Sequence, residues 1–159
     1  MMQKTLVLIK PDGVKRAISG KIISRFEDTG LKINGMKLTW IDKEFSKKHY
    51  SEHVKKSFYK TLEKFITSGP VLAMVLEGVN AIEVVRKMVG NTEPLKAMPG
   101  TIRGDFAHLD TEWANCKNKC IPNLIHASDS PESAKKEISL WFDNKELYNY
   151  NTANENFVF

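Results

Sequence analysis

The stretch 123–130 contains the residue types for covalent catalysis. His126 directly follows the apolar pair Leu124 and Ile125, which predicts the end of a short buried strand where a side chain can reach a cleft. Glu137 lies further on, at the shoulder of an apolar helical stripe, where a half-buried carboxylate needs a partner. Because helical side chains lean toward the helix N-terminus, Glu137 is expected to reach back toward His126. A neutral imidazole oriented by a carboxylate is the arrangement of a nucleophilic histidine.

Three basic residues occupy positions from which their side chains can approach His126. Lys10 follows the apolar run 5–9 and so stands at the carboxyl end of a predicted strand. Arg86 lies at the edge of a helical stripe, and Arg103 lies in the aperiodic segment 91–122, which is too long for a passive connection. Taken singly, a solvated lysine or a packed core histidine is the simpler interpretation. Together, three permanent cations and a positioned histidine predict a phosphoryl-transfer site.

The elements that must hold these groups follow from hydrophobic periodicity. Apolar runs at 5–9 and 71–76 predict buried strands, and alternation over 31–40 predicts another strand with a bulge at 34–35. The predicted helices are one over about 22–30 that stops at Gly30, two short ones within 43–63, one capped by Asn80 that stops at Gly90, and one capped by Ser130 with Pro131 in its first position. Residues 10–13 predict a turn. Strands alternating with helices indicate one α/β or α+β domain, without ordering the strands.

Composition narrows the function classes. With 159 residues, 42% hydrophobic and 27% charged, the chain has the make-up of one globular domain. A net charge of +5 suits a polyanionic ligand such as a nucleotide or a nucleic acid. No apolar run approaches the roughly 20 residues of a membrane span, and no signal peptide precedes the first strand. Two cysteines are too few for a disulfide scaffold, which favours an intracellular, cytoplasmic protein.

Four motifs give the chain a family resemblance. They are KPDGV at 10–14, SGPV at 68–71, PGTIRGDF at 99–106 and NLIHASDS at 123–130. In this order, and over essentially the whole length from Thr5 to about Phe142, the chain resembles a nucleoside diphosphate kinase. The resemblance implies an α+β, ferredoxin-like βαββαβ fold, with a four-stranded antiparallel sheet covered by helices. It also implies a single domain over 1–159, with 143–159 as a C-terminal tail.

The same resemblance implies ping-pong transfer of the γ-phosphate from a nucleoside triphosphate to a nucleoside diphosphate, through a phosphohistidine on His126. Mg²⁺ would be bound through the nucleotide phosphates, with no metal site on the protein. The implied site residues are Glu137 and Ser128 supporting the ring, Tyr50 lining the site, Lys10, Arg86, Thr92 and Arg103 on the phosphates, Lys10 and Asn123 on the sugar, and Phe58 and Leu62 at the base. A homo-oligomer is implied, a hexamer or tetramer built from dimers. Neither a membrane nor a nucleic-acid partner is expected.

Some positions depart from the family pattern. Residues 107–122 look like an insertion, expected next to the site or at a subunit contact. They include Cys116 and Cys120, which are compatible with free thiols, an i,i+4 disulfide or half of a metal site. Free thiols are favoured, because zinc normally needs four ligands and only His108 is an obvious extra one. Ala127 replaces the glycine common after the histidine, and Lys60-Thr61 stands where many relatives have Pro-Gly.

Two expectations remain, one about the C-terminal tail and one about an alternative function. The tail aromatics are expected to pack on the body or on a neighbouring subunit; they are Tyr148, Tyr150, Phe157 and Phe159. The alternative function is a catalytically silent ferredoxin-like module that binds nucleic acid or protein, supported by the basic charge and the lengthened loop. Against it, the central strand 5–9 lacks the stacked aromatic pair that RNA-binding sheets use.

Overall fold

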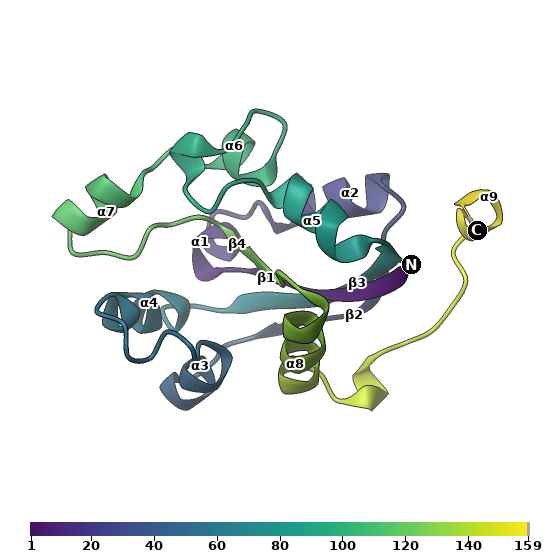
Figure 1. Ribbon diagram of the computed structural model, residues 1–159, viewed down its shortest axis with the longest axis horizontal. Coiled ribbons are helices and arrows are strands. Elements are labelled where there is room, and N and C mark those ends of the chain that lie inside the picture. The colour runs from purple at the N-terminus through teal and green to yellow at the C-terminus, as the bar shows by residue number, and fades with distance from the viewer. Residues whose placement is uncertain (159) are drawn as a thin grey trace.

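The computed structural model describes residues 1–158 and contains one four-stranded sheet (Figure 1). The strands are β1 (Met2–Ile9), β2 (Lys32–Thr39), β3 (Val71–Val79) and β4 (Ile125–Ala127), in the spatial order β2-β3-β1-β4. All neighbouring pairs are antiparallel. This order confirms the predicted α+β, ferredoxin-like fold. The predicted bulge is also present, as a shift in the β2–β3 register between Ile33 and Gly35.

Helices cover both faces of the sheet (Figure 1). One layer contains α2 (Ser19–Asp28) and α5 (Ala81–Val89), and the other contains α3 (Lys43–His49), α4 (Tyr59–Ile66) and α8 (Pro131–Trp141). The side chains of β1 alternate between the two layers, with Val7 and Ile9 in one core and Leu6 and Leu8 in the other. Burial on both faces explains why the second half of β1, residues 6–9, is apolar at every position.

Short helices occupy segments that were predicted to be irregular. The predicted turn at 10–13 is instead the start of α1 (Pro11–Lys15). The aperiodic segment 91–122 contains η1 (Pro94–Lys96), α6 (Ile102–Phe106) and α7 (Thr111–Cys116). Pattern analysis missed these helices because each is about one turn long, so no apolar stripe has room to repeat.

The two predicted helix caps behave differently. Ser130 accepts the backbone N–H of Ser133 at 3.1 Å and caps α8, as predicted. Asn80 precedes α5, but it has a left-handed backbone with φ 51° and its side chain caps no helical N–H. Its Oδ1 accepts instead from the N-terminal ammonium of Met1 at 3.4 Å. The capping prediction for Asn80 was therefore wrong, because a tertiary contact replaces the local one.

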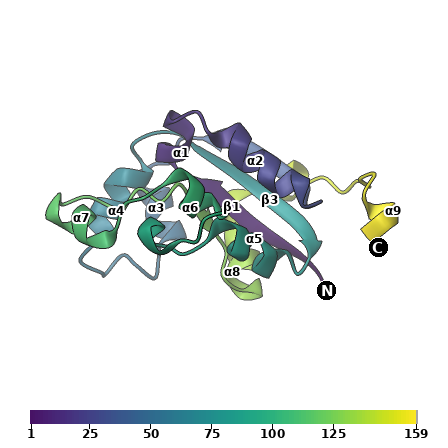
Figure 2. The same cartoon turned by 90° about the horizontal axis from the view of Figure 1, so that it is seen from above.

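Residues of the C-terminal tail contact the edge strand β2. The end of the tail, with α9, reaches away from the sheet (Figure 2). Tyr148 and Asn34 exchange two hydrogen bonds of 2.7 and 2.9 Å, and Lys32 binds Glu155 at 3.0 Å. After η2 (Asn144–Glu146), the tail ends in α9 (Glu155–Val158), where the Phe157 side chain is 90% exposed. The Tyr150 hydroxyl donates to the Ile33 carbonyl at 2.9 Å, so this side chain packs on the body as predicted. Tyr148 is held by its main chain alone and its side chain is 66% exposed, Phe157 does not pack on the body, and Phe159 lies outside the described residues.

Candidate functional site

His126 lies in the middle of β4, opposite Leu8 of β1, rather than at the end of the strand. Its Nε2 atom is 3.0 Å from Oε1 of Glu137, which α8 presents to the sheet. The other carboxylate oxygen, Oε2, accepts a hydrogen bond of 2.5 Å from the Ser128 hydroxyl. Ser128 itself is buried and accepts the backbone N–H of Leu6 at 3.3 Å. The imidazole, the carboxylate and the hydroxyl are thus joined by hydrogen bonds in one series, which the Leu6 N–H anchors to β1.

The charges in this hydrogen-bonded series determine which nitrogen of His126 carries the lone pair. Burial opposes ionisation of Glu137, but the hydrogen bond and charge of His126 and the bond from Ser128 hold the pKa of this carboxyl below its usual value. An ionised Glu137 accepts the proton that the neutral ring carries on Nε2. The ring lone pair is then on Nδ1, for which residues 1–158 supply no hydrogen-bond partner. Nδ1 is therefore the atom available for nucleophilic attack.

Lys10 begins the basic part of the site. It follows β1 directly, and only 7% of it is exposed. Its Nζ donates to Oδ1 of Asn123 at 2.7 Å, while Nδ2 of Asn123 donates to the main-chain oxygen of Thr92 at 2.8 Å. Burial, followed by the nearby charge of Arg103, lowers the pKa of Lys10 to about 8. An anion bound here would relieve that repulsion, so the pocket is prepared for negative charge.

Arg103 on α6 is 4% exposed and organises the main chain around β4. Its acceptors are the carbonyl oxygens of Gly90, Asn123 and Ile125, at 3.1, 3.1 and 2.6 Å. A guanidinium has five N–H groups, so two remain for a ligand. Burial and then the charge of Arg86 lower the pKa of Arg103 to about 10. Arg86 is exposed, and within residues 1–158 its guanidinium donates to the Ala127 carbonyl alone, at 3.4 Å, which leaves the remaining N–H groups available.

A γ-turn joins Asn123 to β4, the strand that carries His126. The N–H of Ile125 donates to the Asn123 carbonyl at 2.7 Å, and Leu124 between them has φ 68°. Asp12 Oδ2 accepts the Leu124 N–H at 3.0 Å, and the Lys10 N–H donates to the Leu124 carbonyl at 2.8 Å. A leucine in this conformation costs about 1–3 kcal/mol, and these hydrogen bonds hold it. The sequence carried no signal for the turn, because leucine disfavours positive φ.

Sequence analysis missed His49, which packs beside the His126 ring. Its ring centroid lies 4.9 Å from that of His126, with the planes at 84°. Burial, and then the His126 charge, lower the pKa of His49 to about 3, so it is neutral. The indole N–H of Trp141 donates to its Nδ1 at 3.1 Å, which leaves the proton on Nε2. The neighbouring Tyr50 is buried as well, and burial raises the pKa of its hydroxyl. The only sequence signal for His49 was its place beside Tyr50.

Among residues 1–158, one set of three histidine, cysteine or acidic side chains is close enough to hold a metal ion. The set contains His49, His126 and Glu137, whose ligand atoms lie within 4.8 Å of one another. Because Nδ1 of His49 accepts from Trp141, Nε2 of this neutral ring carries a proton and offers no lone pair. The set therefore lacks the donors for a metal. Cys116 and Cys120 are free thiols.

The predicted base-binding residues lie on the outer part of the site. Phe58, which precedes the first turn of α4, is 47% exposed and packs against His53 with ring centroids 5.7 Å apart. Leu62 is buried one turn further along α4. The Thr92 side chain is exposed, and only its carbonyl contacts Asn123. This part of the site is open, whereas the part around His126 is enclosed.

Comparison with known proteins places these observations in a family. The model of the family described as nucleoside diphosphate kinase matches residues 3–147. The nucleoside diphosphate kinase of Pyrococcus horikoshii is 57% identical over 151 residues, which cover 95% of this chain and 92% of that protein. The nucleoside diphosphate kinase of Archaeoglobus fulgidus is 50% identical over 158 residues, covering 99% and 98%.

Solved structures agree over the same length. A transition-state mimic of nucleoside diphosphate kinase from Borrelia burgdorferi, with bound vanadate and ADP, superposes with a TM-score of 0.93 and 45% identity, covering 97% of this chain and 95% of that one. A halophilic nucleoside diphosphate kinase from Halobacterium salinarum in complex with CDP gives a TM-score of 0.90 and 42% identity, covering 100% and 99%.

Proposed function

Because the chain belongs to the nucleoside diphosphate kinase family, whose members are phosphotransferases, we propose that His126 carries a phosphoryl group from one nucleotide to another. The donor is a nucleoside triphosphate and the acceptor a nucleoside diphosphate. The observation that carries this assignment is the chain of Ser128, Glu137 and His126, which leaves Nδ1 unprotonated beside buried cations.

Each half-reaction exchanges one bond for another. Nδ1 of His126 attacks the γ-phosphorus, a nitrogen–phosphorus bond forms, and the bond from phosphorus to the bridging β–γ oxygen breaks. The nucleoside diphosphate departs with that oxygen, so no proton is needed at the leaving group. The second diphosphate reverses these steps through its own terminal oxygen. The developing positive charge on the ring is balanced by Glu137, which already accepts the Nε2 proton.

The cations supply charge stabilisation. Lys10 and Arg103 are held by hydrogen bonds before substrate arrives, so little reorganisation is needed when charge shifts in the transition state. Arg86 adds an exposed guanidinium at the entrance, and Thr92 completes the phosphate contacts. Lys10 and Asn123, which share a 2.7 Å hydrogen bond, reach the ribose hydroxyls. Tyr50 lines the site beside the catalytic ring.

Mg²⁺ is assigned to the nucleotide. The groups that face the phosphates are cations, so the ion would be held by phosphate oxygens and water, as this metal commonly is. When bound, Mg²⁺ neutralises phosphate charge. The protein residues then position the phosphate chain against Nδ1 of His126.

The base rests on Phe58, with Leu62 beneath it. Every base has a π-face, so an aromatic platform tolerates all of them and predicts broad nucleotide use. The silent nucleic-acid module loses its support, because RNA-binding sheets use an open face and both faces of this sheet carry helices. The two free thiols suit a cytoplasmic setting.

The enzyme is a homo-oligomer built from dimers. β2 is an edge strand; Met36 and Leu38 on it and Trp40 just after it alternate in sequence, with half or more of each side chain exposed. An apolar edge of this kind is a pairing surface unless it is covered. Light scattering measures the assembly, and a monomer at micromolar concentration would contradict it. No helix among residues 1–158 is long and apolar enough to cross a membrane.

Labelling with γ-³²P-ATP tests the proposed function. The wild type should acquire label that is stable in base and labile in acid, as expected for phosphohistidine, and unlabelled ADP should remove it. His126→Ala should take up none, while circular dichroism shows an unchanged fold. Undiminished label on His126→Ala would overturn the assignment of the nucleophile.

A further inference from the structure

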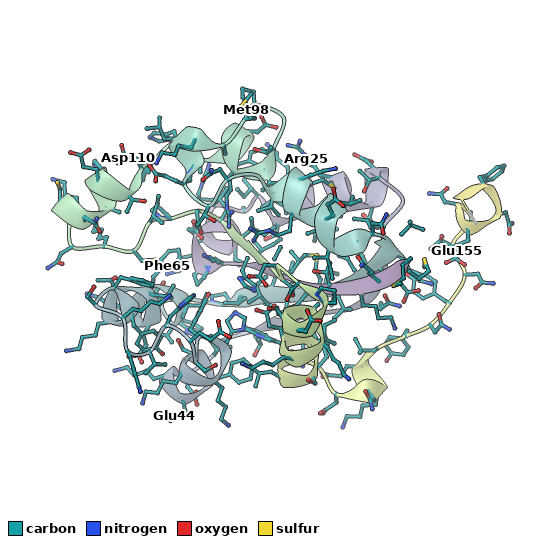
Figure 3. The ribbon with its side chains drawn as sticks, in the orientation of Figure 1. Arg25, Glu44, Phe65, Met98, Asp110 and Glu155 are labelled. Atoms are coloured by element: carbon teal, nitrogen blue, oxygen red, sulfur yellow. The ribbon has the colours of Figure 1, made fainter. Side chains whose placement is uncertain are left out.

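His49 connects the His126 ring to a cluster of aromatic side chains between α3 and α8. Phe45 and His49 are one turn apart on the side of α3 that faces α8, whereas Figure 3 labels Glu44 on the outer side of this helix. The Trp141 indole meets both rings edge to face, with centroids 4.8 Å from Phe45 and 5.5 Å from His49. His49 in turn lies 4.9 Å from His126 at 84°. Because aromatic pairs favour this geometry, the four rings form one packed series.

Trp141 fixes the orientation of His49. Only 3% of Trp141 is exposed, and its indole N–H donates to Nδ1 of His49 at 3.1 Å. Since Nδ1 accepts this bond, Nε2 of the neutral ring carries the proton. The Nε2 atom is buried and has no hydrogen-bond partner among residues 1–158. A buried donor without a partner lowers stability, so folding stability alone does not explain a histidine at this position.

His49 contacts the catalytic pair without taking the hydrogen-bond partner of His126. A ring nitrogen of His49 lies within 4.8 Å of a ring nitrogen of His126 and of a carboxylate oxygen of Glu137. A charged His49 would compete with His126 for this carboxylate. Burial, followed by the charge of His126, lowers the pKa of His49 to about 3, so the ring is neutral near pH 7. Glu137 therefore remains available to His126.

The His126 ring needs a restraint besides its hydrogen bond. The torsion about the Cβ–Cγ bond of a histidine is broad and roughly two-fold. A half-turn about this bond would put ring carbons where Nε2 meets Glu137 and where Nδ1 must meet the nucleotide. The 3.0 Å contact to Glu137 holds one edge of the ring. The perpendicular His49 ring, itself fixed by Trp141, occupies space through which the imidazole would have to turn.

We propose that His49 is a positioning residue for phosphoryl transfer. Its ring, held by Trp141, keeps the His126 imidazole in the one orientation in which Nε2 meets Glu137 and Nδ1 faces the nucleotide. This inference rests on the proposed function. The side chain has two separable properties, because its ring acts on His126 whereas its Nδ1 acceptor acts on Trp141. If His49 were only structural, the reaction rate would follow folding stability in every variant.

Two substitutions separate the ring from the acceptor. His49→Phe keeps a ring but leaves the Trp141 N–H unpaired, so the urea midpoint should fall while the single-turnover rate of His126 phosphorylation stays within about twofold of the wild type. His49→Asn keeps an acceptor near the place of Nδ1 but removes the ring. Its rate should fall about tenfold, with a smaller loss of stability than in His49→Phe. The dissociation constant of ADP should be unchanged in both variants.

The matched control is His108→Asn. It makes the same substitution at an exposed histidine that follows α6, away from the aromatic cluster. This variant should equal the wild type in rate and in urea midpoint.

¹⁵N spectra of the histidine rings give a second measurement, with the His126 signals assigned by their loss in His126→Ala. In the wild type, neutral His126 should show the Nε2–H form alone. In His49→Asn the ring nitrogens should shift toward a mixture of the two tautomers, because the imidazole is no longer held against Glu137. A loss of packing elsewhere in the protein would not produce this change.

The outcomes separate this inference from the proposed function. A wild-type rate and a single tautomer in His49→Asn would overturn the positioning role while phosphohistidine labelling persists. A tenfold slower His49→Phe would also contradict it, since a ring at position 49 should suffice. Absence of labelling in the wild type would instead count against the proposed function itself. If His49→Asn does not fold, His49→Gln takes its place, and the rate of His49→Phe is decisive in either case.

Discussion

The two ends of the site are built in opposite ways. At the phosphate end, Lys10, Arg103 and Ser128 are buried, and hydrogen bonds tie them to main chain or to neighbouring side chains. At the base end, Phe58 is 47% exposed and directly precedes α4, a helix of eight residues. The phosphate end is supported by the inner strand β1 and by β4, which pairs with it. The base end is supported by elements at its periphery.

This difference matches what each end must do. Phosphoryl transfer depends on placement of charge to within a fraction of an ångström, which only a packed, hydrogen-bonded shell provides. A base platform needs a flat face and little else, so exposure does no harm. We therefore expect substitutions at the phosphate end to affect rate and folding stability together, and substitutions at the base end to affect substrate affinity alone.

Arg103→Met should have the largest effect. It removes two free N–H donors from the phosphates and leaves three main-chain carbonyls without their partner. We expect kcat/KM to fall about 1,000-fold and the free energy of unfolding to fall by about 3 kcal/mol. Steady-state kinetics and urea unfolding measure the two quantities.

Arg86→Met is the matched control, because it deletes the same charge from an exposed position. It should reduce kcat/KM but change the free energy of unfolding by less than about 0.5 kcal/mol. Equal destabilisation by the two variants would break the contrast between buried and exposed cations.

Glu137→Gln should have the next largest effect. The amide keeps the size of the side chain and still accepts from Nε2 of His126, but it no longer balances positive charge on the ring. We expect phosphorylation of His126 in a single turnover to slow about 10- to 100-fold with little change in folding. Glu132→Gln, on the exposed first turn of α8, is the control and should react at the wild-type rate. A Glu137→Gln rate equal to wild type would mean that Glu137 is only structural.

The parts of the site that follow a periodic element could be predicted from sequence. Periodicity placed Lys10 at the end of a buried strand and put Glu137 within reach of His126, because both rules concern contacts along regular elements. The order of the strands required the family resemblance, since hydrophobic pattern is identical for a parallel and an antiparallel buried strand. Asn80 was misjudged because its side chain has a tertiary partner, Met1.

The other features of the site depend on tertiary contacts that leave no pattern in the local sequence. The γ-turn at Leu124 is held by Asp12, which is 112 positions away in sequence. His49 acquires its place beside His126 only when α3 packs on the sheet. The helices in 91–122 are too short to repeat a pattern. In each case tertiary structure decides the conformation, so reasoning from single segments fails.

The pH dependence of nucleotide binding should show the burial of Lys10. Its pKa in the free enzyme is about 8, below the usual value, and a bound polyphosphate raises it. Above pH 8, binding must therefore take up a proton, so affinity falls as pH rises. We expect the dissociation constant of ADP to increase about tenfold from pH 7 to pH 9, measured by isothermal titration calorimetry.

Lys10→Arg provides the control for this step, because a guanidinium keeps its charge over the same range. Whatever the dissociation constant of this variant at pH 7, its rise between pH 7 and pH 9 should be absent. An identical rise in the variant would show that a group other than Lys10 titrates. Protonation of Lys10 would then not be coupled to nucleotide binding.

Phe58→Ala should have the smallest effect of these substitutions, and it tests the base end of the site against the phosphate end. Removing an exposed ring deletes the stacking platform but no buried contact, so KM should rise about fivefold and the free energy of unfolding should change by less than about 0.5 kcal/mol. Because an aromatic face stacks on any base, the rise in KM should be similar for ADP, GDP, CDP and UDP when each is measured with the same donor. Phe58→Tyr keeps the face and should match the wild type. A loss confined to one base would show that position 58 recognises a base edge, and a fall in kcat at saturation would show that the base end also helps to align the phosphates with His126.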